Sequence, residues 1–426
     1  MDTIFALASA RGKAGVAVIR VSGTLAFDVA HELCGELPEP RRATVRKLTF
    51  QGVVLDHALV LLFEDGASFT GEKIVEFQVH GGLATISAVL SALGSFAGLR
   101  MAEPGEFSRR ALQSGRMDLT QIEGLADLVE AETEAQRRQA MAVLEGALGQ
   151  KAREWRGRLV RALALLEATI DFSEEDVPDD LSREVSGNVL AVLTDLQAAL
   201  AGAASSERVR EGFEVAIIGA PNVGKSTLLN ALAGRDAAIT SSIAGTTRDV
   251  IEVRMDIGGL PVTLLDTAGL RVTEDEIERI GVERALSRAK SADMRVFLRE
   301  GDEVLPLEPH EDDLVLLAKA DLRGDQVGAV SGLTGAGLDL LIDAICGVLG
   351  QRVKGSGLVI RKRHQFALQR AASSLTSAVD LLDNRGAAEL VAEEIRSAAR
   401  AIESLIGRVG VEDLLDEIFS SFCIGK

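Results

Sequence analysis

The stretch "FEVAIIGAPNVGKST", residues 213 to 227, decides the fold of the middle of the chain. Its second half fits the pattern G-x-x-x-x-G-K-[ST], with an apolar strand-like run before it and a helix-forming run, "STLLNALAG", after it. Gly219 and Gly224 let the backbone curl so that its N–H groups point at phosphate oxygens. Lys225 then supplies a positive charge to the β- and γ-phosphates, and Ser226 supplies a hydroxyl to Mg²⁺. The stretch predicts a nucleotide-binding loop on a parallel α/β sheet.

Four further fragments follow in the order and spacing of a GTPase: "GTTRD" (245–249), "DTAG" (266–269), "AKAD" (318–321) and "SGLTG" (331–335). The first two correspond to switch segments that respond to the γ-phosphate and its magnesium ion. In the third, Asp321 offers a carboxylate to the N1 and N2 donors of guanine, which favours GTP over ATP. The predicted GTP-binding residues in the first stretch and these fragments are Asn222, Val223, Gly224, Lys225, Ser226, Thr227, Thr246, Thr247, Asp266, Thr267, Ala268, Gly269, Lys319, Asp321, Ser331, Gly332 and Leu333.

Two positions depart from the usual GTPase pattern. The guanine fragment normally begins with Asn but begins here with Ala318, so a hydrogen bond that braces the loop is lost. We expect nucleotide affinity to be weaker by about 1 kcal/mol, the worth of an ordinary hydrogen bond, and release to need no exchange factor. Many GTPases also place a water-orienting Gln after the switch glycine, where this chain has Leu270. Another group must therefore activate water: a carboxylate from "TEDEIERIGVERA" (273–285), a bound cation or a partner.

Periodicity divides the 426 residues into four segments. Residues 1–118 combine β-rich runs such as "KIVEFQVHGG" with a helix and predict an α+β domain. Residues 119–210 have apolar side chains at helical spacing, residues 211–352 alternate strands with helices, and residues 353–426 are helical again. The predicted fold is an α/β multidomain protein: an N-terminal α+β domain and a discontinuous helical domain, with a P-loop GTPase domain inserted in the latter.

Composition limits the compartment and the kind of partner. A formal net charge of -18 argues against a large basic surface that wraps nucleic acid, although a local basic patch or a nucleic-acid-binding partner remains compatible. The three cysteines, Cys34, Cys346 and Cys423, are far apart, so we expect a reducing compartment and no disulfide framework. Asp2 near the start argues against a signal peptide, and no apolar run reaches the roughly 20 residues of a membrane span. We expect a cytoplasmic protein that does not associate with membranes.

These features and several longer stretches resemble one family, the tRNA-modification GTPases called MnmE or TrmE. The resemblance covers essentially the whole chain. It rests on the GTPase fragments together with "DTI" (2–4), "VIRVSG" (18–23), "SFTGEKIVEFQVHGG" (68–82), "PGEFSRRALQSGRMDLTQIEGLADLVEAET" (104–133) and "CIGK" (423–426).

The resemblance implies a folate-binding and dimerising N-terminal domain, a helical domain and an inserted GTPase domain. It also implies an activity in which a homodimer works with a FAD-containing partner, MnmG (GidA). Together they would add an aminomethyl-type or carboxymethylaminomethyl group to C5 of the wobble uridine of certain tRNAs. The one-carbon unit would come from 5-formyl-tetrahydrofolate or a related tetrahydrofolate, and most tRNA contact would come from the complex.

The resemblance also addresses the problem posed by Leu270. In the family, potassium-dependent dimerisation activates the GTPase domains, and Asn222, Ser241, Ile243 and Thr246 match the positions that coordinate K⁺. A cation there would offset developing charge, as an arginine finger does elsewhere. The resemblance also implies that Ser241 belongs to the GTP-binding residues. Glu278 matches the glutamate that orients the attacking water, and Ser226 and Thr247 are the expected Mg²⁺ ligands.

For the folate, the matching positions are Arg20, Glu76, Arg116 and Lys426. Arg116 is usually Lys in the family, so the charge persists while the contact differs. Taken alone, each of these charges also fits an ordinary surface pair. Cys423 invites a prenylation reading that Lys426 and Gly425 disfavour, which leaves a reactive thiol near the modification chemistry or a structural cysteine that anchors the tail.

Two other functions compete with this one. The first is a ribosome-assembly GTPase, a switch that binds rRNA without modifying it, but the basic RNA-binding module usual in that class is not visible after residue 350. The second is a GTP-regulated folate protein outside tRNA metabolism. The most basic local run, "RKRHQ" (361–365), fits either a contact with tRNA phosphate or a solvated helix start.

Overall fold

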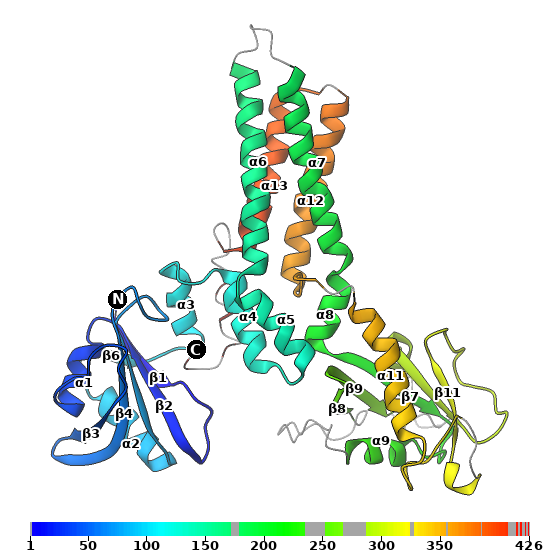
Figure 1. Cartoon of the computed structure of the whole chain (residues 1–426), viewed down its shortest axis with the longest axis horizontal. Helices are drawn as coiled ribbons and strands as arrows, with labels where there is room; N and C mark the ends of the chain where they lie inside the picture. Colours follow the sequence, from blue (N-terminus) through cyan, green and yellow to red (C-terminus); the bar gives the residue numbers. More distant parts are fainter. Residues whose placement is uncertain are drawn as a thin grey trace, which may run out of the picture. The chain divides into compact units, whose positions relative to one another are not determined.

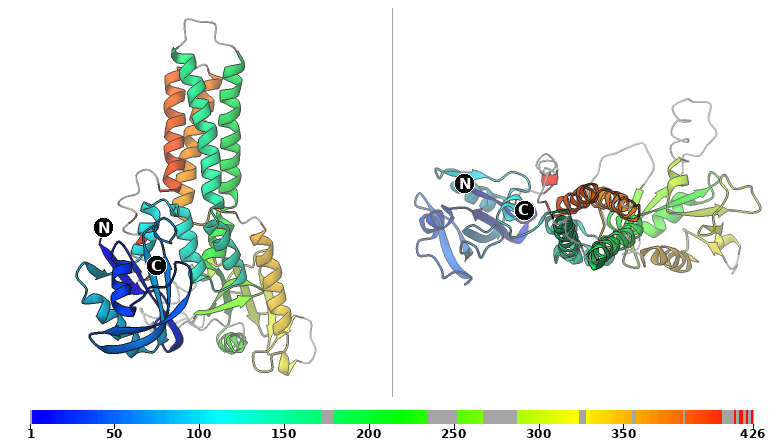
Figure 2. Two further views of the ribbon diagram at one scale, coloured as in Figure 1. Left: turned by 60° about the vertical axis from the view of Figure 1, so that its left-hand side comes forward. Right: turned by 90° about the horizontal axis from the view of Figure 1, so that it is seen from above.

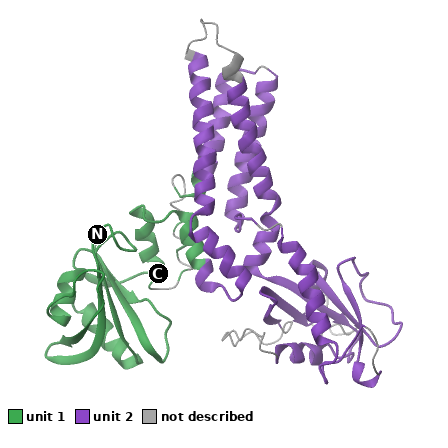
Figure 3. Ribbon diagram, viewed as in Figure 1, with its two compact units in different colours: residues 1–126, 403–426 green, residues 127–402 purple. Residues whose placement is uncertain are grey.

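The computed structural model describes the residue ranges 2–171, 179–234, 252–266, 287–323, 328–354, 357–384 and 386–407, together with residues 415, 418, 419, 422 and 425. It forms two compact units (Figure 3). The N-terminal unit contains residues 1–126 and 403–426, and the larger unit contains residues 127–402. The first unit is therefore built from both ends of the chain.

The N-terminal unit is built on a six-stranded sheet in the order β3-β4-β5-β2-β1-β6 (Figure 1). Its elements are β1 (Thr3–Leu7), β2 (Ala14–Ser22), α1 (Ala26–Cys34), β3 (Thr44–Phe50), β4 (Val53–Phe63), β5 (Ile74–Gly81), α2 (Leu83–Gly94), β6 (Leu99–Met101) and α3 (Glu106–Gln113). Neighbouring strands are antiparallel except β1 and β6, which are parallel. Two elements, α4 (Leu119–Glu130) and α13 (Ala388–Leu405), cross the boundary between the units.

The two faces of this sheet have different cover. Alternation along β2 sends Ile19 and Val21 to one face, where they pack with side chains of α1 and α2 in the core of the unit. The same alternation sends Arg20 and Ser22 to the opposite face. There a smaller apolar cluster, formed by Ile4, Ala6, Ala102 and Phe107, packs with Phe69. Polar side chains therefore share the second face with a limited apolar cover.

The larger unit begins with a helical part. It contains α5 (Glu134–Leu144), α6 (Ala147–Asp171), α7 (Asp179–Ala201), α8 (Ala203–Glu211) and α12 (Lys362–Asp383) as well as most of α13. The long helices α6, α7, α12 and α13 lie side by side in both views of Figure 2. Polar contacts join them: the Trp155 indole donates to Asp195 at 3.2 Å, and Arg396 pairs with Glu167 at 2.7 Å. Segments more than 200 residues apart in sequence thus form one bundle.

The nucleotide-binding part follows α8. Its sheet has the order β12-β11-β10-β7-β9-β8. The elements are β7 (Phe213–Gly219), α9 (Lys225–Ala233), β8 (Glu252–Ile257), β9 (Leu260–Asp266), β10 (Met294–Arg299), β11 (Leu314–Ala318), the 3₁₀ turn η1 (Ala320–Leu322), β12 (Ala329–Val330) and α11 (Leu338–Val353). The strands are parallel except β8, which runs antiparallel to β9. The sheet is therefore mixed but mostly parallel, which confirms the predicted fold class.

Division of the chain into the four predicted segments stays a prediction. Contacts in the structure group residues 119–126 and 403–426 with the N-terminal unit rather than with the helical part. The Leu119 amide donates to the Ile406 carbonyl at 3.4 Å, and a Cβ on Gly407, whose φ is +78°, would lie 3.0 Å from the Leu119 Cβ.

One helical stretch, Arg183–Glu211, is long and apolar enough by length and composition to cross a membrane. It comprises most of α7 and all of α8. Val185, Val189, Val192 and Leu196 of this stretch are buried, and α7 packs against α6 and α12. Core helices of helical bundles are often as long and as apolar, so length and composition alone are weak evidence for a membrane span.

Candidate nucleotide-binding and N-terminal sites

The phosphate-binding loop connects β7 to α9. At its start, a Cβ on Gly219 would lie 2.5 Å from the Leu298 carbonyl oxygen on neighbouring β10, so only glycine fits there. Two residues of the loop have left-handed backbone, Asn222 with φ +62° and Gly224 with φ +108°. Gly224 precedes the first turn of α9, whose unpaired N–H groups form the anion-binding end of a helix. The loop therefore has the backbone that binding of phosphate needs.

Lys225 lies inside this loop. Its side chain is 6% exposed, and Nζ donates to the carbonyl oxygens of Gly219 and Ala220, each at 2.9 Å. Burial lowers the pKa of Lys225, while the nearby Asp266 carboxylate opposes that shift. These carbonyl contacts hold the Lys225 ammonium group inside the loop that is predicted to bind the phosphates.

Ser226 and Asp266 meet beside the loop, as a magnesium site requires. Ser226 Oγ donates to Asp266 Oδ2 at 2.8 Å. Asp266 is 2% exposed, and among the described residues its second oxygen, Oδ1, has no hydrogen-bond partner. A buried carboxylate oxygen without a donor is costly unless a cation or water satisfies it. A hydroxyl and a carboxylate are oxygen ligands suited to Mg²⁺, so these two residues fit that ion.

The predicted guanine-binding residues also come together. Lys319 has left-handed backbone (φ +60°), and η1 with Asp321 follows it directly. Ser331 Oγ donates to Asp321 Oδ1 at 2.5 Å and accepts from the Leu333 amide at 3.2 Å. A Cβ on Gly332 would lie 2.6 Å from backbone atoms of Thr227 and Leu228, so this loop lies directly against the start of α9. The structure thus brings the base-binding turn and the phosphate-binding loop together.

In the N-terminal unit, Arg20 and Glu76 face each other on β2 and β5. Arg20 Nη2 lies 2.8 Å from Glu76 Oε1, and the two side chains are 20% and 16% exposed. The Arg20 guanidinium lies 5.5 Å from the Phe69 ring centroid and 5.6 Å from that of Phe107. Arg116 lies elsewhere, on the segment after α3, where it donates to the Gly66 carbonyl at 3.2 Å. No described contact joins Arg116 to the pair.

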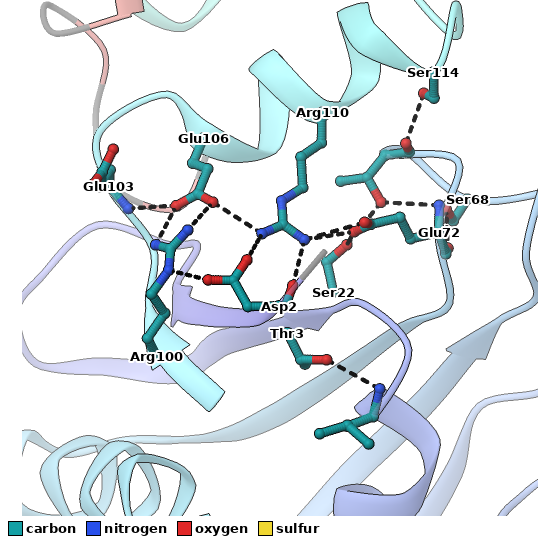
Figure 4. A network of polar contacts seen from close by, with 12 residues as sticks. Asp2, Thr3, Ser22, Ser68, Glu72, Arg100, Glu103, Glu106, Arg110 and Ser114 are labelled. Atoms are coloured by element: carbon teal, nitrogen blue, oxygen red, sulfur yellow. Dashed lines mark hydrogen bonds and ion pairs between the residues drawn. The ribbon is translucent and has the colours of Figure 1, made fainter. Parts of the chain in front are cut away.

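A network of ion pairs lies on the same face of the sheet. Figure 4 shows Arg110 of α3 between three carboxylates: Nη1 lies 3.0 Å from Glu72, and Nη2 lies 2.9 Å from Glu106 and 3.1 Å from Asp2. Ser22 donates to Glu72 at 2.8 Å and shares a hydrogen bond with Thr70. Because Thr70 and Glu72 belong to this network, it fixes the segment that carries Phe69. The network also lies close to Arg20 along β2, since Ser22 is only two residues away.

The pKa values of two acids in this network are lowered. Hydrogen bonding from Arg100 is the main cause of the lowered pKa of Asp2. Burial opposes the shift at Glu106, but hydrogen bonds from Arg100, the Glu103 amide and Arg110 together lower the pKa of its carboxyl. Both acids are therefore charged wherever the unit is folded at neutral pH.

A separate cavity of 580 Å³ in the N-terminal unit lies between α2, β1 and β6. Apolar side chains such as Phe5, Ile86 and Leu90 line most of it, and its lining includes neither Arg20 nor Glu76.

Ten of the predicted site residues lie outside the described residues. They are Ser241, Ile243, Thr246, Thr247, Thr267, Ala268, Gly269, Glu278, Cys423 and Lys426. Of the other predicted nucleotide contacts, Val223 is buried in the core below the loop and Leu333 is 78% exposed.

Sequence reasoning missed three residues around these sites. Glu300 and Arg323 contact the base-binding turn, and Arg110 organises the network on the N-terminal sheet. Arg110 lies within a stretch that carried the family resemblance, which marked the stretch but not the residue. No pattern of spacing indicated Glu300 or Arg323.

The mostly parallel sheet and its phosphate-binding loop define a P-loop GTPase, here carried by a protein with a helical bundle and a separate N-terminal unit. Comparison with known proteins names the family. The model of the MnmE helical domain matches residues 119–423, and that of the GTP-binding protein TrmE N-terminus matches residues 3–116. The chain belongs to the MnmE family of tRNA modification GTPases.

Curated relatives match over their full length. The tRNA modification GTPase MnmE of Cereibacter sphaeroides is 58% identical over 428 residues, with 100% of both chains covered. The protein of that name from Roseobacter denitrificans is 58% identical over 429 residues, again with 100% of both covered. A solved structure, a variant of Era from Aquifex aeolicus bound to GDP·AlF4⁻, is 29% identical over 32% of this chain and 56% of its own, with a TM-score of 0.26. The chain is therefore a GTPase that acts in tRNA modification.

Proposed function

We propose that this GTPase works with a flavoprotein partner, MnmG (GidA), on the wobble uridine of certain tRNAs. The pair adds an aminomethyl-type or carboxymethylaminomethyl group to C5 of the base, using the one-carbon unit of a tetrahydrofolate such as 5-formyl-tetrahydrofolate. Full-length identity of 58% to curated tRNA modification GTPases carries this proposal. Protein and partner act in the cytoplasm, and the chain forms a homodimer through its N-terminal unit.

In the nucleotide site, separate groups of described residues bind the phosphates, the guanine base and the magnesium ion. Backbone N–H groups of the loop and Lys225 bind the phosphates, and Asp321 with Lys319 selects guanine, while Ser331 holds Asp321 in place. Ser226 and Asp266 would hold the magnesium ion, and bound Mg²⁺ would neutralise charge on the β- and γ-phosphates. In hydrolysis, water attacks the γ-phosphorus and the bond to the β–γ bridging oxygen breaks, which leaves GDP and phosphate.

Activation of that water is assigned to Glu278 and to a potassium site, of which only Asn222 belongs to the described residues. Many GTPases orient the attacking water with a glutamine, and this chain has Leu270 at that position. We assign the role to Glu278 instead. Asn222, Ser241, Ile243 and Thr246 would hold potassium, and Thr247 would be a further ligand of magnesium. Support from the described part of the chain comes from Asn222, whose left-handed backbone places it on the curled part of the phosphate-binding loop.

A tetrahydrofolate would bind over the open face of the N-terminal sheet. Glu76 accepts from an amine of the pterin, and Arg20 contacts either ring oxygens or the glutamate tail. Support comes from their position: an ion pair 2.8 Å long, less than one quarter exposed and bordered by two aromatic rings. Arg116 and Lys426 are proposed as further charged contacts, and Cys423 as a thiol near them.

Mass analysis of nucleosides from tRNA tests the main proposal. A strain that lacks this chain should lose the C5 group from wobble uridines, and the wild-type gene should restore it. Unchanged wobble uridines together with defective ribosomal subunits would favour a ribosome-assembly GTPase instead.

The potassium proposal has its own test. GTP hydrolysis should be faster in KCl than in NaCl, and Asn222→Ala should remove the difference while GDP still binds. Equal rates in the two salts for the wild-type chain would contradict it. Glu278→Ala should lower kcat by about 10²-fold or more, the usual worth of a positioned acid–base group, with little change in GTP affinity.

A further inference from the structure

The turn that binds guanine is braced by two charged residues outside the guanine motif. In this chain the motif begins with Ala318, which is 3% exposed and whose methyl group can donate no hydrogen bond. The turn nevertheless has demanding geometry, because Lys319 adopts left-handed backbone without being glycine. Something other than the motif's first side chain must hold it.

Arg323 supplies the first contact. Its Nε donates to the Ala318 carbonyl oxygen at 3.1 Å, and Nη2 donates to the Glu300 carbonyl oxygen. These two carbonyls belong to neighbouring strand ends, since Arg299 of β10 is in register with Leu317 of β11. The planar guanidinium, with five donors in a fixed fork, can bridge two acceptors in this way. Arg323 thus ties the end of β11 to the end of β10.

Glu300 supplies the second contact through its side chain. Glu300 Oε1 lies 2.5 Å from Lys319 Nζ, and both side chains are partly exposed, at 40% and 37%. The ion pair fixes the ammonium end of the lysine whose stem belongs to the predicted base-binding surface. The ion pair adds little to stability because water screens it. It nevertheless determines where the Lys319 ammonium lies.

We propose that Glu300 and Arg323 together replace the missing asparagine of the guanine motif. Both are positioning residues: they hold Lys319 and, through η1, Asp321 in the arrangement that receives guanine. The proposal rests on the guanine-binding role given above to Lys319 and Asp321. It also changes one expectation from the sequence, since the loss at Ala318 is offset by contacts that the motif does not include.

Titration of the purified full-length chain with a fluorescent GDP tests the brace. Arg323→Ala should weaken binding about 5- to 10-fold, the loss expected for one or two hydrogen bonds, and Glu300→Gln should weaken it about 3- to 10-fold. In an Ala318→Asn background, Arg323→Ala should cost no more than about twofold, because the restored amide braces the turn. Equal losses in the two backgrounds would overturn the replacement.

A second readout separates positioning from general destabilisation. IDP lacks the 2-amino group that donates to Asp321, so the ratio of GDP affinity to IDP affinity reports how well that carboxylate is placed. We expect the ratio to fall in Arg323→Ala and to stay unchanged in Arg254→Ala, which removes an exposed arginine of β8 in the same sheet.

Two outcomes identify which idea fails. Unchanged GDP affinity and an unchanged ratio in both Arg323→Ala and Glu300→Gln overturn the brace. An unchanged ratio in Asp321→Asn overturns guanine recognition by this turn, and with it the basis of the proposal.

Discussion

Asp321 is the residue on which the choice of base depends. Ser331 donates to one of its oxygens, and the carboxylate lies on the turn directly after Lys319. Because a carboxylate only accepts hydrogen bonds, it complements the N1 and N2 donors of guanine. Replacement by a side chain that both donates and accepts should therefore change the preferred base.

Asp321→Asn is expected to weaken GDP binding by about 10²-fold, the loss of two hydrogen bonds to a charged acceptor. The same variant should bind XDP more tightly than the wild type does, because the amide can donate to the 2-oxo group of xanthine. Competition of GDP and XDP for the site measures both effects. Asp302→Asn, at an exposed position of the same domain, is the control. A preference for GDP that survives Asp321→Asn would contradict the assigned role.

At this scale, the sequence predicted residues whose roles are local. Gly219, Gly224 and Lys225 could be predicted because a phosphate-binding loop needs fixed backbone at fixed spacing. Glu300 and Arg323 could not, because their partners are backbone atoms of another strand end and a side chain 19 residues away. Such pairings depend on the register of β10 against β11, which spacing alone does not give.

Among the elements, α3 shows how a short helix can organise a sheet face. Five of its eight residues are buried, and three of these have charged or polar side chains: Glu106, Ser108 and Arg110. Arg110 is 5% exposed with carboxylates on three sides. Removing one partner from a buried ion pair leaves uncompensated charge. The network is thus sensitive to the loss of Arg110, which is its most buried cation, while Arg100 pairs with Asp2 and Glu106 nearer the surface.

Arg110→Met should destabilise the N-terminal unit by about 3–5 kcal/mol, the cost of breaking a buried ion pair from one side. Urea unfolding followed by a probe in this unit measures the loss. Arg42→Met, at an exposed arginine of the same unit, should change little. Equal stability of Arg110→Met and wild type would show that water, rather than Arg110, satisfies the carboxylates.

The same network predicts a dependence on pH. The pKa values of Asp2 and Glu106 lie below their ordinary values of 3.8 and 4.5 in the folded unit. An acid whose pKa is lower in the folded state contributes stability that is fully present above its ordinary pKa. This stability is lost as the pH falls through the pKa of the folded state. Because Arg100 is the main cause of both lowered values, the free energy of unfolding should fall more steeply below pH 4.5 in wild type than in Arg100→Met. Parallel curves would contradict this assignment.

The sequence predicted the long strands better than the short or peripheral ones. β2, β5, β7 and β9 correspond to runs that alternate or are continuously apolar. The strands β1, β3, β6 and β8 were not predicted. β3, β6 and β8 are sheet edges, whose pairing comes from neighbours rather than from their own pattern, and β1 is a run of only five residues. The antiparallel direction of β8 could not be inferred either, since a short connection to β9 decides it.

At the scale of the whole molecule, the two units have separate cores and separate proposed ligands. Ligand that binds only a folded state stabilises that state by mass action. GDP at 100 times its Kd should thus stabilise the larger unit by about 2.7 kcal/mol and leave the N-terminal unit unchanged. A reduced folate should do the reverse. Calorimetry of the full chain resolves the two transitions, and a folate that shifts only the GDP-sensitive transition would contradict the assigned sites.

The late segment of the chain completes the core of the first unit. Phe419 is fully buried, its ring lies 5.2 Å from the Arg109 guanidinium, and a Cβ on Gly105 would lie 2.9 Å from it. Phe419→Ala should cost about 3–5 kcal/mol, typical of a large aromatic removed from a core. Phe366→Ala, at a phenylalanine 63% exposed on α12, is the control. Loss of stability confined to the GDP-sensitive transition would show that Phe419 belongs to the other unit.

That a residue as late as Phe419 packs beside Gly105 has a consequence for protein synthesis. The 276 residues from 127 to 402 emerge from the ribosome between the two parts of the N-terminal unit. At ordinary elongation rates this delay is roughly 15 to 55 seconds. During that interval the side of α3 that later packs against Phe419 remains uncovered and accessible to chaperones and proteases. Only a chain translated through Phe419 closes this surface, so termination before that residue should leave a product that the cell can recognise and degrade.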